Sequence, residues 1–412
     1  MSSFKTRSVV LILLAFVLGC SEFIIVGVLD DISTQLHVGV STVGYLVTIF
    51  ALVYAVSTPF VTSAVGQHTL YRFELVLMII FIGGNVLSAF AFTYPVLVVS
   101  RVITAIVSGP LISIGLTFAN YIAPLAKKAW LMSWIFSGFS IASVFGVPLG
   151  TWIATMAGWR MAFAAIVVIS IITMVLMALS LPQDLRQHKA RKMASEHKQG
   201  SGGELELFRD RRIQLGMLLP MFNLAGAYVV YTYLRPLLSR TLGFATGTVT
   251  ILLFIYGLMS LASNQLSGRL ADHGGLLRMP RIFGIEAILL LLIPAALLTR
   301  VTGLAGLFLM GVMMYLINAP IQMHFLAVAE QDHPQAIVMA SSLNSIFSNF
   351  GIALGSATGG VIVDHLGMTV TGFGGAVYIL VAMGLVIWLN RVNKAHAAKK
   401  AEVAEAAAPA KN

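Results

Sequence analysis

Long apolar segments alternate with short polar ones along the whole chain. A helix that spans a bilayer requires about 20 mostly apolar residues, and on this basis we predict twelve of them. Six lie at roughly 8–29, 41–64, 74–93, 96–119, 129–156 and 160–181. Six more lie at roughly 213–235, 247–270, 281–299, 303–329, 336–362 and 370–391. The pattern therefore predicts an all-α membrane protein with twelve transmembrane helices.

A polar and basic stretch in the middle of the chain divides this pattern into two halves. Residues 182–212 include Gly200-Ser201-Gly202-Gly203, which is typical of a flexible cytoplasmic linker. We expect six-helix bundles at 1–181 and 213–391, followed by a tail at 392–412 that is either disordered or a fraying helix. Phe136 to Ala142 resembles Phe347 to Ala353 at an offset of 211 residues, so the two bundles look like pseudo-symmetric repeats.

Composition agrees with a polytopic membrane protein. Of the 412 residues 58% are hydrophobic and 10% charged, whereas soluble domains carry about 25% charged residues. The net charge is +10, but the basic residues cluster in short loops, which argues against nucleic-acid binding. With a cytoplasmic N-terminus, 21 of the 26 Lys and Arg residues fall in cytoplasmic segments. We therefore expect both termini on the cytoplasmic side of a bacterial inner membrane.

The chain has one cysteine, Cys20, which excludes a disulfide within the chain and argues against a Cys-based metal site. Lys5 and Arg7 precede an apolar run that ends at Cys20, and this run loosely resembles a lipoprotein signal. We favour an ordinary first transmembrane helix, because apolar residues resume at Phe23. We expect neither a metal nor a cofactor.

Small residues recur every four positions in two of the predicted helices. One stripe consists of Gly138, Ala142, Gly146 and Gly150, and the other of Gly351, Gly355 and Gly359. Residues at i and i+4 share a helix face, and a face without side chains lets another helix approach closely in a bilayer. Pro148 removes a backbone donor within the first stripe. We expect both stripes to lie where the two bundles meet and to permit rocking.

Two charged residues lie well inside predicted spans, where charges are costly and usually functional: Glu22 in the first helix and Arg101 in the fourth. Both fall in the outer half of the first bundle, so they could pair. Burial favours a neutral carboxyl and a nearby guanidinium favours a charged one, and this balance suits a residue that loads and releases protons. The alternative is a static buried ion pair. No other acid has comparable predicted depth; Glu286 and Asp364 are expected to be interfacial, and His324 packed or wetted.

Polar and aromatic residues lie on predicted helices seven, ten and eleven, with no charge among them. They are Asn223, Tyr228, Tyr231, Tyr315, Asn318, Gln322 and Asn344. Such a set suits a neutral or weakly charged ligand held by hydrogen bonds and aromatic contacts. The alternative is that these side chains only form hydrogen bonds between helices.

Several of these motifs together resemble the major facilitator superfamily, and specifically its twelve-helix drug:proton antiporter branch with the sugar, arabinose-related and purine nucleoside efflux proteins. Gly138, Gly146, Pro148 and Gly150 match the glycine-proline motif of that branch, although Val147 intrudes before the proline. An acid in the first helix and an arginine that opens the helix-four motif, here Arg101 with Gly109 downstream, also match.

The loop signature of the superfamily is present in the second half of the chain. Its residues are Gly268, Arg269, Asp272 and Arg278, whereas only Gly66 and Arg72 remain of the first-half copy. The resemblance implies that the second-half residues form a cytoplasmic latch. The alternative is an ordinary turn with solvated charges.

The resemblance implies a monomeric transporter in the lipid bilayer that exports a small organic solute, of the drug, sugar or nucleoside and purine class, in exchange for protons. The proton gradient is its only energy source. Proton-coupled uptake by the same fold and a non-transporting receptor or scaffold remain alternatives. We set an enzyme aside, because the short loops lack paired acids and His/Asp/Glu clusters.

Overall fold

The computed structural model describes residues 4–63, 69–124, 127–183, 204–272, 274–333 and 336–406. Gly66 and most of the predicted linker lie outside these ranges. The first half forms α1 (Phe4–Leu36), α2 (Val40–Ser63), α3 (Leu70–Ala89), α4 (Tyr94–Ile122), α5 (Lys128–Ala157) and α6 (Trp159–Ser180). The second half begins with the short 3-10 helix η2 (Glu204–Arg209) and α8 (Arg211–Tyr231), followed by α9 (Leu234–Pro236) and the π-helical turn η3 (Leu237–Thr241). It continues with α10 (Thr246–Asp272), α11 (Gly275–Ala296), α12 (Arg300–Met313), α13 (Asn318–Asp332), α14 (Ile337–His365), η5 (Met368–Val370) and α15 (Thr371–Ala406).

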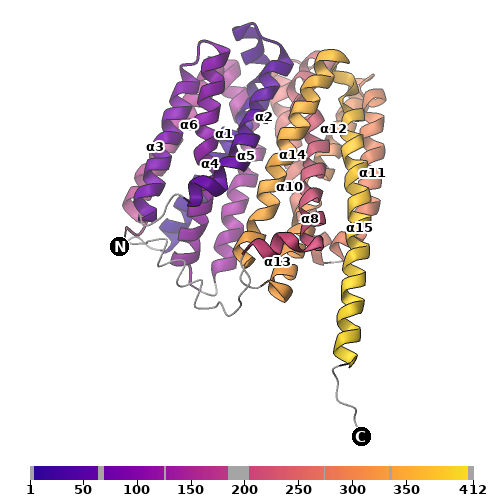
Figure 1. Cartoon of the computed structure of the whole chain (residues 1–412). Coiled ribbons are helices and arrows are strands. Elements are labelled where there is room, and N and C mark those ends of the chain that lie inside the picture. The colour runs from indigo at the N-terminus through magenta and orange to yellow at the C-terminus, as the bar shows by residue number, and fades with distance from the viewer. Residues whose placement is uncertain are drawn as a thin grey trace.

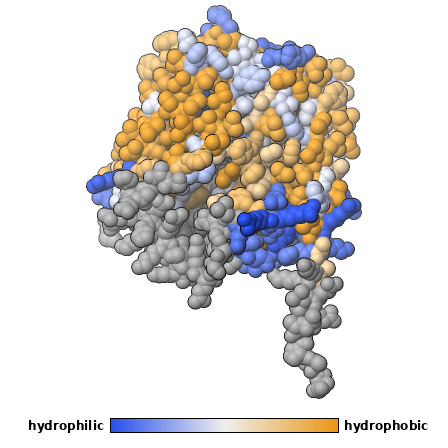
Figure 2. All heavy atoms as spheres, in the orientation of Figure 1, coloured by the Kyte–Doolittle hydropathy of each residue, from blue (hydrophilic) through white to orange (hydrophobic). Residues whose placement is uncertain are grey.

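The surface of the molecule matches a multi-pass membrane protein. Within the described ranges, eleven helical segments are long and apolar enough to cross a membrane. α11, with 22 residues, is not one of these eleven but packs beside α12 and α15, and with it the long helices number the predicted twelve. Apolar side chains cover the middle of the molecule and polar ones gather at its two ends (Figure 2). This band is the surface that faces lipid, because an apolar side chain is favourable only away from water.

The helices form two groups that use the same pairing of neighbours (Figure 1). In the first group α1 packs against α5 and α3 against α6; in the second, α8 packs against α14 and α11 against α15. The prediction of an all-α protein with two six-helix bundles is thereby confirmed. Both termini lie at the same end of the molecule, which we call the terminal end, and we call the opposite end the far end (Figure 1). α15 continues as a helix to Ala406, which is the second of the two alternatives for the tail.

Two of the predicted helices are broken rather than continuous. The one predicted at 213–235 ends at Tyr231 and continues through α9 and η3, and the one predicted at 303–329 is interrupted by a turn at 314–317. Pro320 explains the second break, because it has no N–H to donate to the carbonyl of Leu316. Ser267 Oγ donates to that carbonyl instead, at 3.0 Å, and accepts from the Ala319 N–H at 2.8 Å. Such a break is tolerated in a membrane when side chains satisfy the freed backbone groups.

The two glycine stripes lie inside the bundles and not between them, so this part of the sequence interpretation is wrong. A Cβ at Gly138 would lie 2.7 Å from the Ile12 carbonyl oxygen, and one at Gly150 would lie 2.9 Å from Ile24, both on α1. Gly351, Gly355 and Gly359 of α14 likewise contact the backbone of α8. The stripes therefore pack the first and fifth helices of each bundle tightly together, because two helices can approach that closely only where one face carries glycines and has no side chains.

Candidate functional site

Glu22 lies near the middle of α1, with 8% of its surface exposed. It borders a cavity of about 10 Å³, together with Phe50 of α2, Tyr228 of α8 and Ile352 of α14. The cavity holds about one water molecule. Its walls come from both bundles, so an acid of the first bundle contacts a space that the second bundle also lines.

Arg101 of α4 is fully buried but does not form an ion pair with Glu22. Its Nη1 donates to Ser21 Oγ at 3.3 Å, and its guanidinium lies 4.3 Å from the ring centre of Phe50. Ser21 in turn donates to Asn85 Oδ1 of α3 at 3.0 Å. Arg101 acts on Glu22 through its charge at longer range. The static ion pair is therefore wrong for this conformation, since no direct contact ties the two residues.

Three of the predicted ligand-binding tyrosines come together beside Glu22. The rings of Tyr228 and Tyr231 lie 5.0 Å apart, and Tyr315, in the turn between α12 and α13, lies within interaction range of Tyr228. The Tyr228 hydroxyl makes no hydrogen bond of good geometry within the described part of the chain. Its nearest hydroxyl partner is that of Tyr315, and a ligand that offers a better-aligned hydrogen bond can replace this contact.

The four predicted amide side chains differ in their contacts. Asn223 donates to the Met314 carbonyl at 2.9 Å and so supports the break before α13, while its Oδ1 has no partner among the described residues. Asn318 donates to Asn264 of α10 at 3.2 Å, which is a contact between helices. Gln322 lies one turn farther along α13, and Asn344 lies on α14 with its Oδ1 unpartnered in the described ranges. Asn318 thus forms a hydrogen bond between helices, which is the alternative to ligand binding. Asn223 and Asn344 each keep an acceptor without a partner in the described ranges.

Sequence reasoning missed three aromatic residues of this region. Phe50 and Tyr54 are four residues apart on α2, and Tyr256 of α10 stacks on Tyr231 with ring centres 5.4 Å apart. The i, i+4 spacing on α2 was a usable signal.

Two further acids are buried as deeply as Glu22. Glu286 lies in the middle of α11 and Glu74 in the second turn of α3, and both are completely buried. Neither carboxyl group has a hydrogen-bond partner in the part of the chain that the structure describes. The expectation that Glu286 is interfacial is therefore wrong. The expectation that no other acid is buried as deeply as Glu22 is wrong as well. The helices begin earlier than their apolar runs, which moved both acids inward.

Ion pairs join the two bundles at the far end. Arg235 of α9 donates to Asp31 of α1 at 2.6 Å, and Arg240 of η3 lies 2.8 Å from Asp30. Nearby, Ser41 of α2 donates to Asp364 of α14. The two ion pairs depend on α1 extending to Leu36, about seven residues beyond its predicted apolar end. They close the far end, which is the outer end in the predicted orientation.

We expect Arg235→Gln to loosen this closure. The substitution leaves Asp31 without its cation, and one lost charged partner shifts an equilibrium between bundle positions by about 1–3 kcal/mol. Ser41, which is 2% exposed, can carry a reporter cysteine in a Cys20→Ser background. Its reaction with a polar thiol reagent should become faster in Arg235→Gln. Arg300→Gln is the matched control, because Arg300 binds Gly243 within the second bundle; equal rates in all three proteins would contradict the closure.

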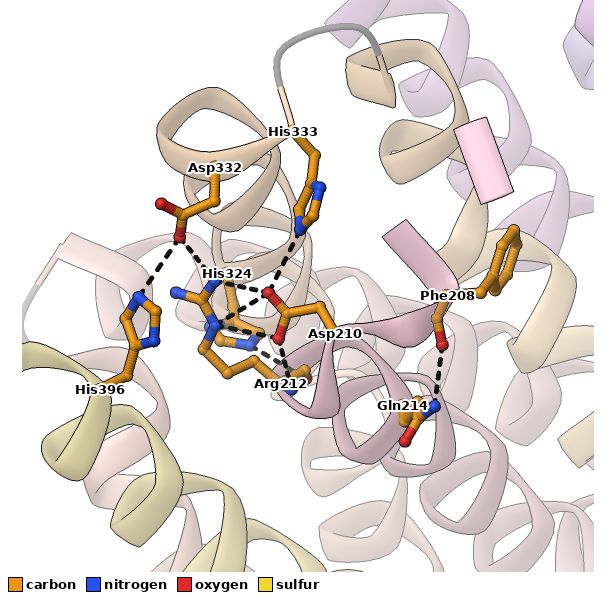
Figure 3. A network of polar contacts seen from close by, with 8 residues as sticks. All are labelled: Phe208, Asp210, Arg212, Gln214, His324, Asp332, His333 and His396. Atoms are coloured by element: carbon orange, nitrogen blue, oxygen red, sulfur yellow. Dashed lines mark hydrogen bonds and ion pairs between the residues drawn. The ribbon is translucent and has the colours of Figure 1, made fainter. Parts of the chain in front are cut away.

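A second charged network lies at the terminal end and belongs to the second bundle (Figure 3). Arg212 contacts Asp210 at 2.5 Å and Asp332 at 2.6 Å, and these two acids also contact His333 and His396. Partial burial opposes ionisation of Asp210, but the hydrogen bonds and charge of Arg212 hold its pKa below the usual 3.8. The network therefore stabilises the fold above about pH 4, and this contribution is lost as the pH falls further.

Arg212→Gln should destabilise the second bundle by about 3 kcal/mol, because it leaves two partly buried carboxylates facing each other. The measurement is the unfolding temperature of the purified protein at neutral pH. Arg211→Gln is the control at the neighbouring position, since Arg211 is exposed and lies 5.0 Å from the ring centre of Trp388. An Arg212→Gln protein as stable as Arg211→Gln would show that the network contributes nothing.

The predicted latch residues lie at the junction of α10 and α11, far in sequence from this network. Gly268, Arg269 and Asp272 form the last turn of α10, and Arg278 lies in the first turn of α11. Asp272 and Arg278 are exposed. A left-handed Gly274, at φ 86°, makes the turn between the helices. The latch stays a prediction.

Comparison with known proteins decides the family. The sequence pattern described as Major Facilitator Superfamily matches residues 11–337. The chain belongs to the Major Facilitator Superfamily. It is 33% identical to the MFS-type transporter YtbD of Bacillus subtilis (strain 168) over 380 residues, which cover 92% of this chain and 94% of YtbD. It is therefore a multi-pass membrane transporter of a superfamily whose members handle small molecules and are generally not enzymes.

Solved structures of the superfamily have the same fold. A D-xylose-proton symporter matches with a TM-score of 0.73 at 16% identity, covering 94% of this chain and 97% of the symporter. The nucleoside transporter NupG matches with a TM-score of 0.69 at 14% identity, covering 94% of this chain and 99% of NupG. At such low identity the likeness concerns the fold alone.

Proposed function

We propose that this transporter exports a small, neutral or weakly charged organic solute in exchange for protons by alternating access. One observation carries the proposal: Glu22, a buried acid without an ion-pair partner among the described residues, borders the same small cavity as Tyr228 of the opposite bundle. A ligand and a proton that meet in one space can each change how favourably the other binds. Such a coupling free energy is what exchange requires.

Glu22 is the proton-coupling residue in this proposal, and Arg101 tunes it. When the cavity is closed, burial favours the neutral acid, because a buried charge without a partner is costly. Opening toward water lowers that cost, and the nearby positive charge of Arg101 then favours release of the proton. Arg101 donates to Ser21 instead of to Glu22, so no direct ion pair holds the proton off Glu22 in this conformation.

Tyr228, Tyr231 and Tyr315 form the ligand contacts, and Asn223, which donates to the carbonyl of Met314 next to Tyr315, and Asn344 each offer an acceptor that has no partner among the described residues. Aromatic rings with a few hydrogen-bonding groups suit a sugar, a nucleoside or purine, or a lipophilic drug. The absence of a second charged group on this cavity wall, among the residues described, supports a ligand without strong charge. The two related structures named for a sugar and a nucleoside are compatible with this class.

Export rests on the resemblance of the Gly138–Gly150 region to the antiporter branch. A second candidate is uptake by symport, which the D-xylose-proton symporter among the related structures favours. The arrangement at the far end suits both, since each direction of transport requires a conformation with the outer end closed.

Flux in sealed vesicles separates these functions. Liposomes that contain the purified protein are loaded in turn with a radiolabelled sugar, a nucleoside and an uncharged lipophilic drug, and a pH gradient is imposed in either direction. Antiport predicts that solute accumulates on the acidic side, whereas symport predicts accumulation on the alkaline side. Counterflow without any response to the gradient would reject proton coupling, and no flux of any solute of the three classes would favour a receptor or scaffold.

A further inference from the structure

Glu286 is a titratable residue that the proposed exchange at Glu22 does not use. It lies on the inward face of α11, between Phe283 and Leu290, and this face is otherwise apolar. The side chain is 0% exposed, and neither carboxyl oxygen has a hydrogen-bond partner in the described ranges. Acids inside a transmembrane bundle are rare and costly, so a purely structural role is a poor explanation.

Among the residues that the structure describes, no charge near Glu286 would stabilise a carboxylate. α11 packs against α10, α12, α13, α15 and η5, and from these elements the titratable group that interacts with Glu286 is the phenol of Tyr256 on α10. The described residues of α12, α13 and α15 place no charged group against it. An unpaired carboxylate in such a place is far less favourable than the neutral acid.

Tyr256 connects Glu286 to Tyr231 and to the break between α12 and α13. Its ring stacks on Tyr231 of the ligand cavity, with an interplanar angle of 26°, and its hydroxyl donates to Met314 Sδ at 3.7 Å. Met314 begins the turn between α12 and α13, and Gly311, one turn earlier, lies against the Tyr256 ring. A rearrangement of this broken helix therefore changes what surrounds Glu286, and a change of charge at Glu286 acts on the cavity wall.

We propose that Glu286 is a second proton-binding site of this transporter, located in the C-terminal bundle and linked to the ligand cavity through Tyr256. The acid is neutral in the closed arrangement described here. It gives up its proton to water when the α12–α13 segment moves and takes one back when the segment returns. The inference deepens the proposed proton exchange by giving the second bundle a site of its own, but proton binding at Glu286 can be tested without any transported solute.

Infrared spectroscopy of the purified protein in liposomes in D2O tests the site directly, because a neutral carboxyl group has a C=O band that a carboxylate lacks. We expect wild-type protein to retain such a band at neutral pH and to lose it reversibly as the pH is raised. Glu286→Gln should remove one component of the band. Glu330→Gln should leave it unchanged, because Glu330 lies exposed on α13.

Three outcomes would overturn the proposal: a Glu286→Gln spectrum identical to that of wild type, a Glu286 component that persists to the highest pH at which the protein stays folded, or a component that is absent from the start. Size-exclusion chromatography checks that Glu286→Gln folds. If it does not, Tyr256→Phe provides the test, since loss of the neighbouring phenol should shift the frequency of the Glu286 component; an unshifted band counts against the link. Loss of the component in a protein without pH-driven flux would support Glu286 as a proton site and reject the exchange function, so the two failures are distinguishable.

Discussion

Glu22→Gln is expected to abolish transport driven by a pH gradient while solute binding persists. Glutamine has nearly the shape of the neutral acid and cannot release a proton, so the mutant stays in the protonated-like state. We expect pH-driven flux to fall more than about tenfold, which corresponds to about 1.4 kcal/mol. Flux is measured in liposomes with an imposed pH gradient, and binding by displacement of a bound solute in detergent.

The pH dependence of binding gives the second part of this test. Wild-type affinity should change with pH, since proton and solute meet in the Glu22 cavity, and in Glu22→Gln the dependence should be much weaker. Glu206→Gln is the control, because Glu206 is exposed and lies outside the bundles on η2. Wild-type rates of pH-driven flux in Glu22→Gln would reject Glu22 as the coupling acid and turn attention to Glu286 or Glu74.

Gly257→Leu is expected to stop transport by keeping the bundles apart. A Cβ at Gly257 of α10 would lie 2.7 Å from Val144 Cα and 2.8 Å from the Val144 carbonyl oxygen on α5, and real Cβ atoms do not approach backbone that closely. That carbonyl is the one that Pro148 leaves without its helical donor. Nearby, Phe145 and Phe254 meet edge to face across the same contact, with ring centres 5.4 Å apart. A leucine at position 257 cannot fit into this arrangement.

The measurement combines flux with the reactivity of a cysteine at Ser41. Gly257→Leu should lose most of its flux, and the reporter should react faster, because the closed arrangement is no longer reached. Gly83→Leu is the control, since a Cβ at Gly83 meets nothing within 4 Å. Normal flux in Gly257→Leu would show that the α5–α10 contact is not part of the transport cycle.

The glycine stripe of α5 shows why this test uses Gly257 and not Gly146. Gly146 belongs to the stripe that the sequence interpretation places between the bundles. In the structure a Cβ at Gly146 would lie 3.2 Å from Cys20 Sγ on α1. A leucine there would damage the packing of the first bundle, and a loss of transport would report misfolding rather than a blocked movement.

The sequence by itself determined the class of the protein, the number of helices and the repeat of the two halves. These features follow from local properties: the length of each apolar run sets a span, and small residues at a spacing of four set one face of a helix. Glu22 and Arg101 could be singled out in the same way, because a charge in an apolar run is conspicuous. The motifs at Gly138–Gly150, Arg101 and Gly268–Arg278 also indicated the superfamily to which the chain belongs.

Only the tertiary structure decided which faces meet. The direction in which the stripe of α5 points, the contact of Arg101 with Ser21 instead of Glu22, and the burial of Glu286 depend on where distant segments lie. The same holds for the ion pairs of Asp30 and Asp31, because the predicted first span ends at residue 29, before both residues. Helix ends and side-chain partners are set by contacts between segments, and hydrophobic periodicity along one chain contains no information about the partner that each face will bury.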